Sequence, residues 1–248
     1  MKNLKNKWGG GGATQYNSRA FTLAEAIITL GIVGIVAAMT LPTVIQKIQD
    51  KQFKTAFKKQ YSVIAQALQL IYAETGQKIE LNDWNESPYY MCLIGEKLKA
   101  KQSGLKCKQI LQKPLGSPLL DADINRKFSW HSNNTWFDKR NKSIWLNSSY
   151  QFNTFILPDG AMINFNCSTD FFIDVNGYKK PNVTGRDIFY FRLPASKNNI
   201  APEFFDSNGI IHVNGCTTSG FYQVTKDTYK EDCLSGSGWG CSPLYIIN

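Results

Sequence analysis

A 25-residue apolar stretch, Phe21–Ile45, constrains this chain more than any other feature of its sequence. A helix of that length can cross the hydrocarbon core of a bilayer, which is about 30 Å thick. The only ionisable side chain in the stretch is Glu25. A carboxylate is costly at such a depth, so its presence marks a functional position.

The segment in front of this stretch, residues 1–20, sets the expected topology. It holds four basic residues, no acid and a run of four glycines. Positive charge beside a first membrane helix favours keeping the N-terminus in the cytoplasm. We therefore expect a leader that takes no part in the fold, followed by a membrane helix and a domain outside the cytoplasm.

The junction RAFTLAEA and the apolar run that follows it resemble the N-terminal segment of type IV prepilins and type II secretion pseudopilins. The resemblance implies cleavage between Ala20 and Phe21, with N-methylation of Phe21. It also implies that Glu25 guides filament assembly and that Pro42 kinks or locally melts the helix. The family usually has glycine before the cut, and Ala20 is likewise small.

The same resemblance implies the partners and the location of the protein. The partners would be a prepilin peptidase and methyltransferase, other pilin subunits, an inner-membrane assembly platform and membrane lipid. The precursor would be a single-pass membrane protein, and the mature form would lie in a pilus or pseudopilus. In the filament, Glu25 would pair with the α-amino group of Phe21 from a neighbouring subunit, because an unpaired buried charge is costly.

Two other interpretations of the N-terminus remain open. Val36-Ala37-Ala38 has the small residues of an ordinary signal-peptide cleavage site. A plain single-span anchor would explain the length of the stretch but not Glu25. Gly31 and Gly34 would let membrane helices approach closely, or are simply tolerated there.

All the cysteines lie beyond the membrane stretch and are even in number, as expected for disulfides in a translocated domain. Their spacing lacks the clustered pairs of a zinc site, although free buried thiols remain an alternative. Cys92 and Cys107 would close one loop. Six cysteines allow 15 pairings. The six are Cys92, Cys107, Cys167, Cys216, Cys233 and Cys241.

Apolar residues continue beyond Pro42 at steps of three or four, which predicts one buried helix face. This helix would end at Gly76 and, counted from Phe21, would span roughly 80 Å. The periodic residues are Phe53, Phe57, Tyr61, Ile64, Leu68 and Ile71. The expected division is therefore a leader (1–20), a transmembrane assembly helix (21–45), its amphipathic continuation (46–76) and a globular domain (77–248).

The globular part reads as β-rich after a less regular insertion at 77–150, in which Met91–Lys99 would form a short helix. Pro158-Asp159-Gly160 and Asn176-Gly177 are turn signals between apolar runs. The cysteine-, glycine- and serine-rich tail, 216–248, is expected to be a stapled loop region. The expected strands are 150–157, 161–166, 171–175, 188–193 and 210–213. The fold class is α+β, a long N-terminal helix packed on a C-terminal antiparallel sheet, as in pilins.

Three oxygen-bearing residues near the late strands form the best candidate site in the globular domain. Asp174, Asn176 and Asp187 lie in a stretch interrupted by turn-forming glycine and proline. Calcium prefers such oxygen-rich loops, and the position resembles the calcium loop of major pseudopilins. The alternative is a structural turn whose acids cap backbone amides.

Charge gives little reason to expect a nucleic acid as a partner. The chain has a net charge of +9, of which the leader contributes +4. The lysines just beyond the membrane stretch are expected to form a solvated helix face, with lipid headgroups or DNA as alternative contacts. These are Lys47, Lys51, Lys54, Lys58 and Lys59.

The sequence shows no recognisable enzymatic machinery. It has only two histidines, His131 and His212, and lacks phosphate-binding, nucleophile-elbow and dinucleotide motifs. The prediction is a structural subunit of a type IV pilus or type II secretion pseudopilus, not an enzyme. The alternatives are a membrane-anchored or secreted disulfide-stapled binding domain and, less well supported, a secreted hydrolase.

Overall fold

The computed structural model divides the chain into two compact units, 1–47 and 48–248. The residues that it describes are 21–76, 79, 87–115, 117–125, 136–144, 153–166, 170–193, 200–206, 208–213 and 222–247.

The first element is a single helix of 53 residues, α1 (Leu23–Thr75). Its helical backbone continues through Pro42, so no local melting occurs there. The predicted stop at Gly76 is confirmed. Gly76 adopts a φ of 66°, which glycine tolerates best, and its N–H donates to the Tyr72 carbonyl at 2.8 Å.

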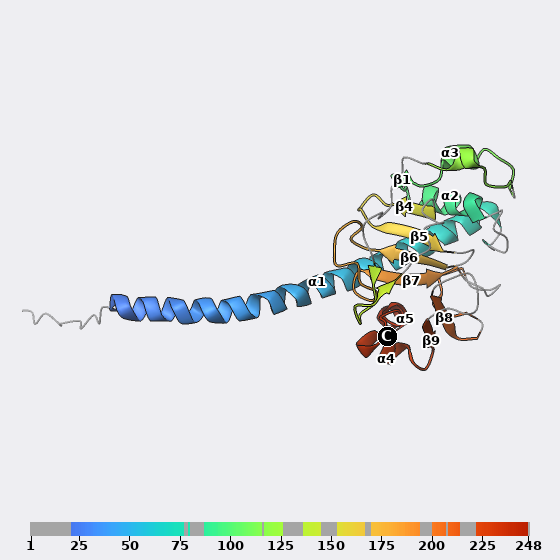
Figure 1. The fold of residues 1–248 in the computed structure, drawn as a ribbon. Coiled ribbons are helices and arrows are strands. Elements are labelled where there is room, and N and C mark those ends of the chain that lie inside the picture. The colour runs from blue at the N-terminus through green and yellow to red at the C-terminus, as the bar shows by residue number, and fades with distance from the viewer. Residues whose placement is uncertain are drawn as a thin grey trace, which may run out of the picture. The chain divides into compact units, whose positions relative to one another are not determined.

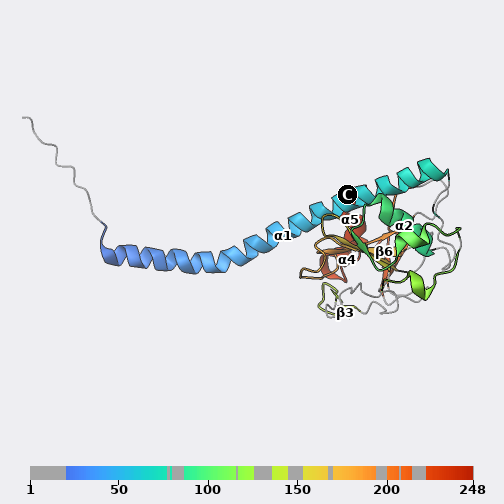
Figure 2. The same ribbon diagram turned by 90° about the horizontal axis from the view of Figure 1, so that it is seen from above.

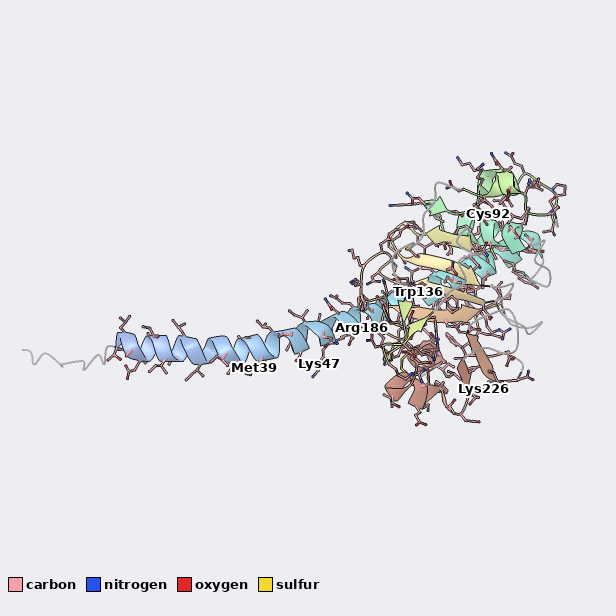
Figure 3. All side chains as sticks on the ribbon, in the orientation of Figure 1. Met39, Lys47, Cys92, Trp136, Arg186 and Lys226 are labelled. Carbon is pink, nitrogen blue, oxygen red and sulfur yellow. A yellow bond between two sulfur atoms is a disulfide. The ribbon has the colours of Figure 1, made fainter. Side chains whose placement is uncertain are left out.

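The first part of α1 exposes its apolar side chains all round the helix (Figure 3). None of its most apolar 18-residue window is buried within the chain, and the helix is long and apolar enough to cross a membrane. A core helix of a soluble fold would bury such a surface. Side chains of this kind that are more than half exposed include those of Leu23, Ile27, Leu30, Val33 and Met39.

The main sheet has five antiparallel strands in the order β1-β4-β5-β6-β7 (Figure 1). The predicted α+β class, a long N-terminal helix with a C-terminal antiparallel sheet, is therefore confirmed. The strands are β1 (Gln102–Ser103), β4 (Thr154–Ile156), β5 (Met162–Asn166), β6 (Asp170–Asp174) and β7 (Ile188–Arg192). The strands β4 and β5 form the hairpin predicted around Pro158-Asp159-Gly160.

One face of this sheet packs against the second half of α1. Phe171 of β6 pairs with Phe191 of β7, and Phe57 of α1 stacks on Phe189 and Phe191 at ring-centroid distances of 4.1 and 5.1 Å. Phe57, Ile64 and the residues around them form one continuous apolar core with these strands. The helical periodicity in the sequence therefore identified the face that meets the sheet.

The opposite face of the sheet is also covered (Figure 2). Two small antiparallel pairs, β2 (Trp136–Phe137) with β3 (Ser143–Ile144) and β8 (Ile210–Val213) with β9 (Tyr222–Thr225), contribute to a second core. In this core the Phe172 ring meets Trp136 at 6.0 Å and Trp239 at 5.2 Å. Cover on both faces explains why every residue of β6 is buried.

The insertion contains α2 (Ser87–Lys97), close to the helix predicted at 91–99, followed by α3 (Cys107–Ile110) and the short 3₁₀ helix η1 (Asp121–Asp123). The tail differs from the prediction of a stapled loop region. Besides β9, it forms α4 (Tyr229–Ser235) and α5 (Cys241–Ile247).

The tail folds because side chains from other elements and from its own turns complete its hydrogen bonds. Asp232 accepts N–H bonds from Ser237 at 2.7 Å and from Gly240 at 2.9 Å, which shapes the link between α4 and α5. Ser242 of α5 accepts the Tyr190 N–H at 2.8 Å, so α5 satisfies a buried donor of β7 at the sheet edge. The helices α4 and α5 depend on tertiary contacts, so the periodicity of the local sequence does not predict them.

Candidate functional site

The start of α1 carries a capping box. Thr22 precedes the helix, and its backbone N–H and its hydroxyl both donate to Glu25 Oε2 at 2.9 Å. In return, the Glu25 N–H donates to Thr22 Oγ1 at 3.2 Å. Two N-terminal amides that lack helical partners are thereby satisfied.

The capping box gives Glu25 a local role that the sequence interpretation missed, although the T-x-x-E spacing signals it. Two of these bonds use one carboxylate oxygen, Oε2, and leave acceptor capacity, because an ionised carboxylate offers about four lone-pair sites. Glu25 can therefore cap its own helix and also accept a cationic donor from another chain. Gln at this position would keep the cap and lose the charge.

The other predicted assembly residues have an open environment in the single chain. Phe21 is 86% exposed, and apart from the adjacent backbone of the helix itself no atom lies within 4 Å of a Cβ built at Gly31 or Gly34. That helices of other chains pack closely against α1 at these glycines therefore remains a prediction. Ala20 lies outside the described residues.

The described residues contain two disulfides, in agreement with the prediction of disulfides whose pairing the sequence left open. Cys92–Cys107 joins α2 to α3, with Cys92 labelled in Figure 3, and Cys233–Cys241 joins α4 to α5. The loop closure predicted for Cys92 and Cys107 is confirmed. Cys167 and Cys216 lie outside the residues whose side chains are described.

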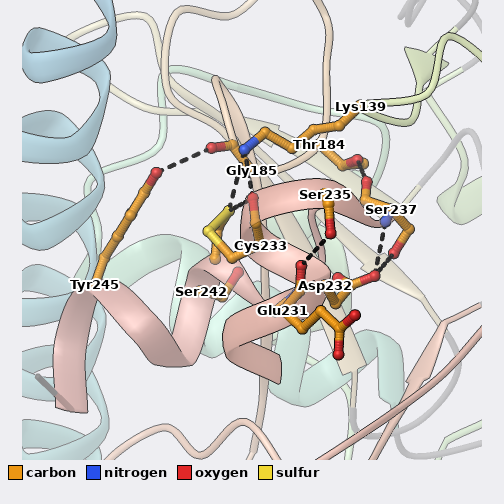
Figure 4. The surroundings of a disulfide bond; sticks show 12 residues. Lys139, Thr184, Gly185, Glu231, Asp232, Cys233, Ser235, Ser237, Ser242 and Tyr245 are labelled. Carbon is orange, nitrogen blue, oxygen red and sulfur yellow. Dashed lines mark hydrogen bonds between the residues drawn. A yellow bond between two sulfur atoms is a disulfide. The ribbon is translucent and has the colours of Figure 1, made fainter. Parts of the chain in front are cut away.

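The Cys233–Cys241 bridge lies in a dense polar cluster (Figure 4). Lys139 Nζ donates to the Cys233 carbonyl at 2.6 Å, and Thr184 Oγ1 donates to the Ser237 carbonyl. Burial lowers the pKa of Lys139. The cluster ties β2–β3 and the loop before β7 to the tail, which is a structural role.

The three residues predicted as a calcium site are brought together around the loop between β6 and β7. Asp187 accepts N–H bonds from Asn182 at 2.8 Å and from Val183 at 2.7 Å. Asp174 Oδ1 accepts the Asn176 N–H at 3.1 Å. Asn176-Gly177 is thus part of a long loop and not the centre of a two-residue hairpin.

This loop is also anchored to α1. Arg186, labelled in Figure 3, donates through Nε to Asp50 Oδ1 at 2.6 Å. The partners come from positions far apart in the sequence, so the loop conformation is set by tertiary contacts as well as by its turns.

The oxygen donors of the loop are of the kind that hard cations prefer, but its carboxylates already accept hydrogen bonds from backbone N–H groups of the loop. The side-chain oxygens of Asn176 and Asn182 are buried without a hydrogen-bond partner. Both acids nevertheless cap backbone amides, and the described residues contain no group of three or more His, Cys, Asp or Glu that could hold a metal. The contacts match the structural-turn alternative directly, and calcium binding remains a prediction.

Asp174 offers a test of this loop. Burial, with the nearby Asp187 as a second cause, raises the pKa of Asp174 well above its ordinary value. When the pKa of a carboxyl is higher in the folded than in the unfolded protein, the group stabilises the fold at low pH. This contribution is fully present below the unfolded-state pKa, near 4, and is lost as the pH rises through the folded-state pKa. Asp174→Asn, which keeps the capping oxygen, should therefore raise the free energy of unfolding at pH 7 and change it little below pH 4.

Thermal unfolding measured across this pH range, with calcium or with a chelator, would decide between the two roles. If calcium binds, it should raise the melting temperature of the wild type at pH 7 and leave that of Asp174→Asn unchanged. If calcium changes the melting temperature of neither protein, the loop does not bind calcium, and its acids have only the structural role of capping backbone amides.

The basic band on α1 is not purely a solvated face. Lys59 Nζ pairs with Asp159 Oδ2 at 2.8 Å, and Lys54 Nζ lies 4.5 Å from the centroid of the Tyr245 ring. Lys51 and Lys58 are exposed. Two of the five lysines therefore help to hold the helix on the domain.

Comparison with known proteins adds no relative: no protein-family model, curated protein or solved structure matches this chain.

Proposed function

We propose that this chain is the precursor of a pilin-like structural subunit that is trimmed at its N-terminus and assembled into an extracytoplasmic filament. The observation that carries the proposal is the division of α1. One helix joins an apolar part whose large side chains are exposed, and which contains Glu25, to a part whose Phe57 face is buried on a sheet.

The exposed apolar part of α1 must be shielded from water both before and after filament assembly. Before assembly, lipid would surround it, since its length and composition match a membrane span. After assembly, the apolar helices of other subunits would replace the lipid. The folded domain would be carried along unchanged, because its core contacts lie within residues 48–248.

Glu25 would set the axial register of the filament. Its capping bonds hold the carboxylate at the first turn of the helix. The charge would then meet the amine that cleavage creates at Phe21 of a neighbouring subunit. An ion pair in a low-dielectric bundle favours one register because misplacing either charge leaves it unpaired.

The experiment that tests this proposal is intact-mass analysis of the mature protein. The mature chain should begin at Phe21 and carry one extra methyl group on its terminal amine. Ala20→Gly should be processed at least as well as the wild type, whereas Ala20→Trp should leave the full precursor. Recovery of mature chains that begin near Met39 would instead establish an ordinary signal peptide and overturn the proposal.

A further inference from the structure

A cavity of about 970 Å³ lies beside the Cys92–Cys107 disulfide. Its walls come from α2, β1, α3 and the segments that connect them. This volume lies at the upper end of the range for small-molecule pockets. The charged and polar residues that line it are Lys99, Lys101, Lys106, Lys108, Glu96, Gln102, Gln109, Gln112, Ser103 and Asn125.

The net positive charge of the chain after the leader is concentrated in the segment that contributes most of this cavity, whose lining has four lysines and one acid, Glu96. Residues 21–248 carry a net charge of +5, and the segment 96–113 has six lysines and one acid, Glu96, which also gives +5. Residues 21–95 have a net charge of zero, and so do residues 114–248. The excess charge is therefore a local property of one 18-residue segment.

The six lysines divide into two groups. Lys97 and Lys113 do not line the cavity, and each is neutralised: Lys97 by Glu74 at 2.5 Å and Lys113 by Asp123 at 2.6 Å. The other four line the cavity and have exposed side chains. Lys106 is held in place, since its Nζ donates to the Ala122 carbonyl at 2.7 Å.

The floor of the cavity is covalently closed and tightly packed. The disulfide closes the loop that contains Lys99, Lys101 and Lys106. Gly95 of α2 lies so close to Phe155 of β4 that an added Cβ would come within 2.4 Å of the ring. A preorganised floor lowers the conformational cost of binding.

We propose that this cavity binds an acidic polysaccharide chain. Lysines supply compact positive charges for its carboxylates, and amide and hydroxyl side chains supply donors and acceptors for sugar hydroxyls. Among the described residues that line the cavity, the one aromatic ring is that of Phe155, which is 1% exposed and cannot stack on a base. Single-stranded nucleic acid binds through base stacking as well as through charge, and the described residues of the lining include no arginine.

The inference does not depend on filament assembly, because the cavity lies wholly in the globular unit. It can be tested on the full unprocessed chain in a non-ionic detergent. The probe is a polygalacturonate oligomer, with uncharged dextran and a single-stranded DNA of similar charge as comparisons. Binding should be measured by calorimetry at two salt concentrations.

Polygalacturonate should bind, and its affinity should fall as salt increases. The double variant Lys101→Gln/Lys108→Gln should bind about tenfold more weakly, because each exposed contact contributes about 1 kcal/mol or less. The matched control is Lys51→Gln/Lys58→Gln, which removes the same charge from exposed positions on α1 and should change affinity less than about twofold.

Three results would overturn the proposal: no binding of polygalacturonate, equal loss of affinity in the two double variants, or DNA binding as tight as that of the polysaccharide. The last would show a general polyanion surface. Since all four substituted lysines are exposed, the variants should fold normally, which circular dichroism would verify.

Discussion

Replacing Glu25 by Gln should reduce incorporation into filaments by roughly two orders of magnitude, while the precursor still inserts into the membrane. Losing one partner of a buried ion pair costs about 3–5 kcal/mol, and each 1.4 kcal/mol is a tenfold change. Insertion should not suffer, because removing a charge makes an apolar helix easier to bury. The readout is the ratio of filament-bound to membrane-bound protein.

The capping box supplies the control for this prediction. Gln can accept the bonds from Thr22 that Glu25 accepts in the wild type, so Glu25→Gln isolates the charge from the cap. Glu25→Ala removes both and should show whether the cap adds to the defect. Co-expression with wild type would separate a failure of register from a failure of insertion. Normal assembly of Glu25→Gln with impaired insertion would make Glu25 an interfacial residue only.

Phe57→Ala should destabilise the globular unit by about 3–5 kcal/mol, the usual range for deleting a buried aromatic side chain. Phe57 is fully buried and stacks on Phe189 and Phe191, so its removal leaves a cavity between α1 and the sheet. The measurement is denaturant unfolding of the full chain in detergent, followed by near-ultraviolet circular dichroism.

Leu70→Ala is the matched control for Phe57→Ala, because Leu70 lies on the same helix and is 53% exposed. It should change the free energy of unfolding by less than about 1 kcal/mol. Equal effects of the two substitutions would mean that α1 contributes helical propensity to the domain but not core packing, contrary to the structure.

Much of the architecture followed from local patterns. The recurrence of apolar residues from Phe57 to Ile71 marked the helix face that is buried, and Gly76 marked its end. The alternating and continuous apolar runs marked β5, β6, β7 and β8. These signals work because helix and strand periods place neighbouring residues on the same or opposite faces whatever the rest of the chain does.

The candidate site was predicted less completely. The sequence placed Asp174, Asn176 and Asp187 in one loop, but not Asn182, whose N–H binds Asp187 and whose side-chain oxygen is buried beside them. The charge run at 96–113 is visible in the sequence. Its division into paired and cavity-lining lysines is not, because Glu74 and Asp123 reach it from other elements.

By itself, the sequence determined the apolar span with its single carboxylate, the amphipathic continuation of that helix, the β-rich domain and the candidate disulfide cysteines. Only the tertiary structure decided that the tail forms α4 and α5, that Cys233 pairs with Cys241, and that four lysines of one short segment line a cavity. The physical reason is separation along the chain. Periodicity records which face of an element is apolar, whereas the bond from Tyr190 to Ser242 joins residues 52 positions apart and exists only once the sheet and the tail have met.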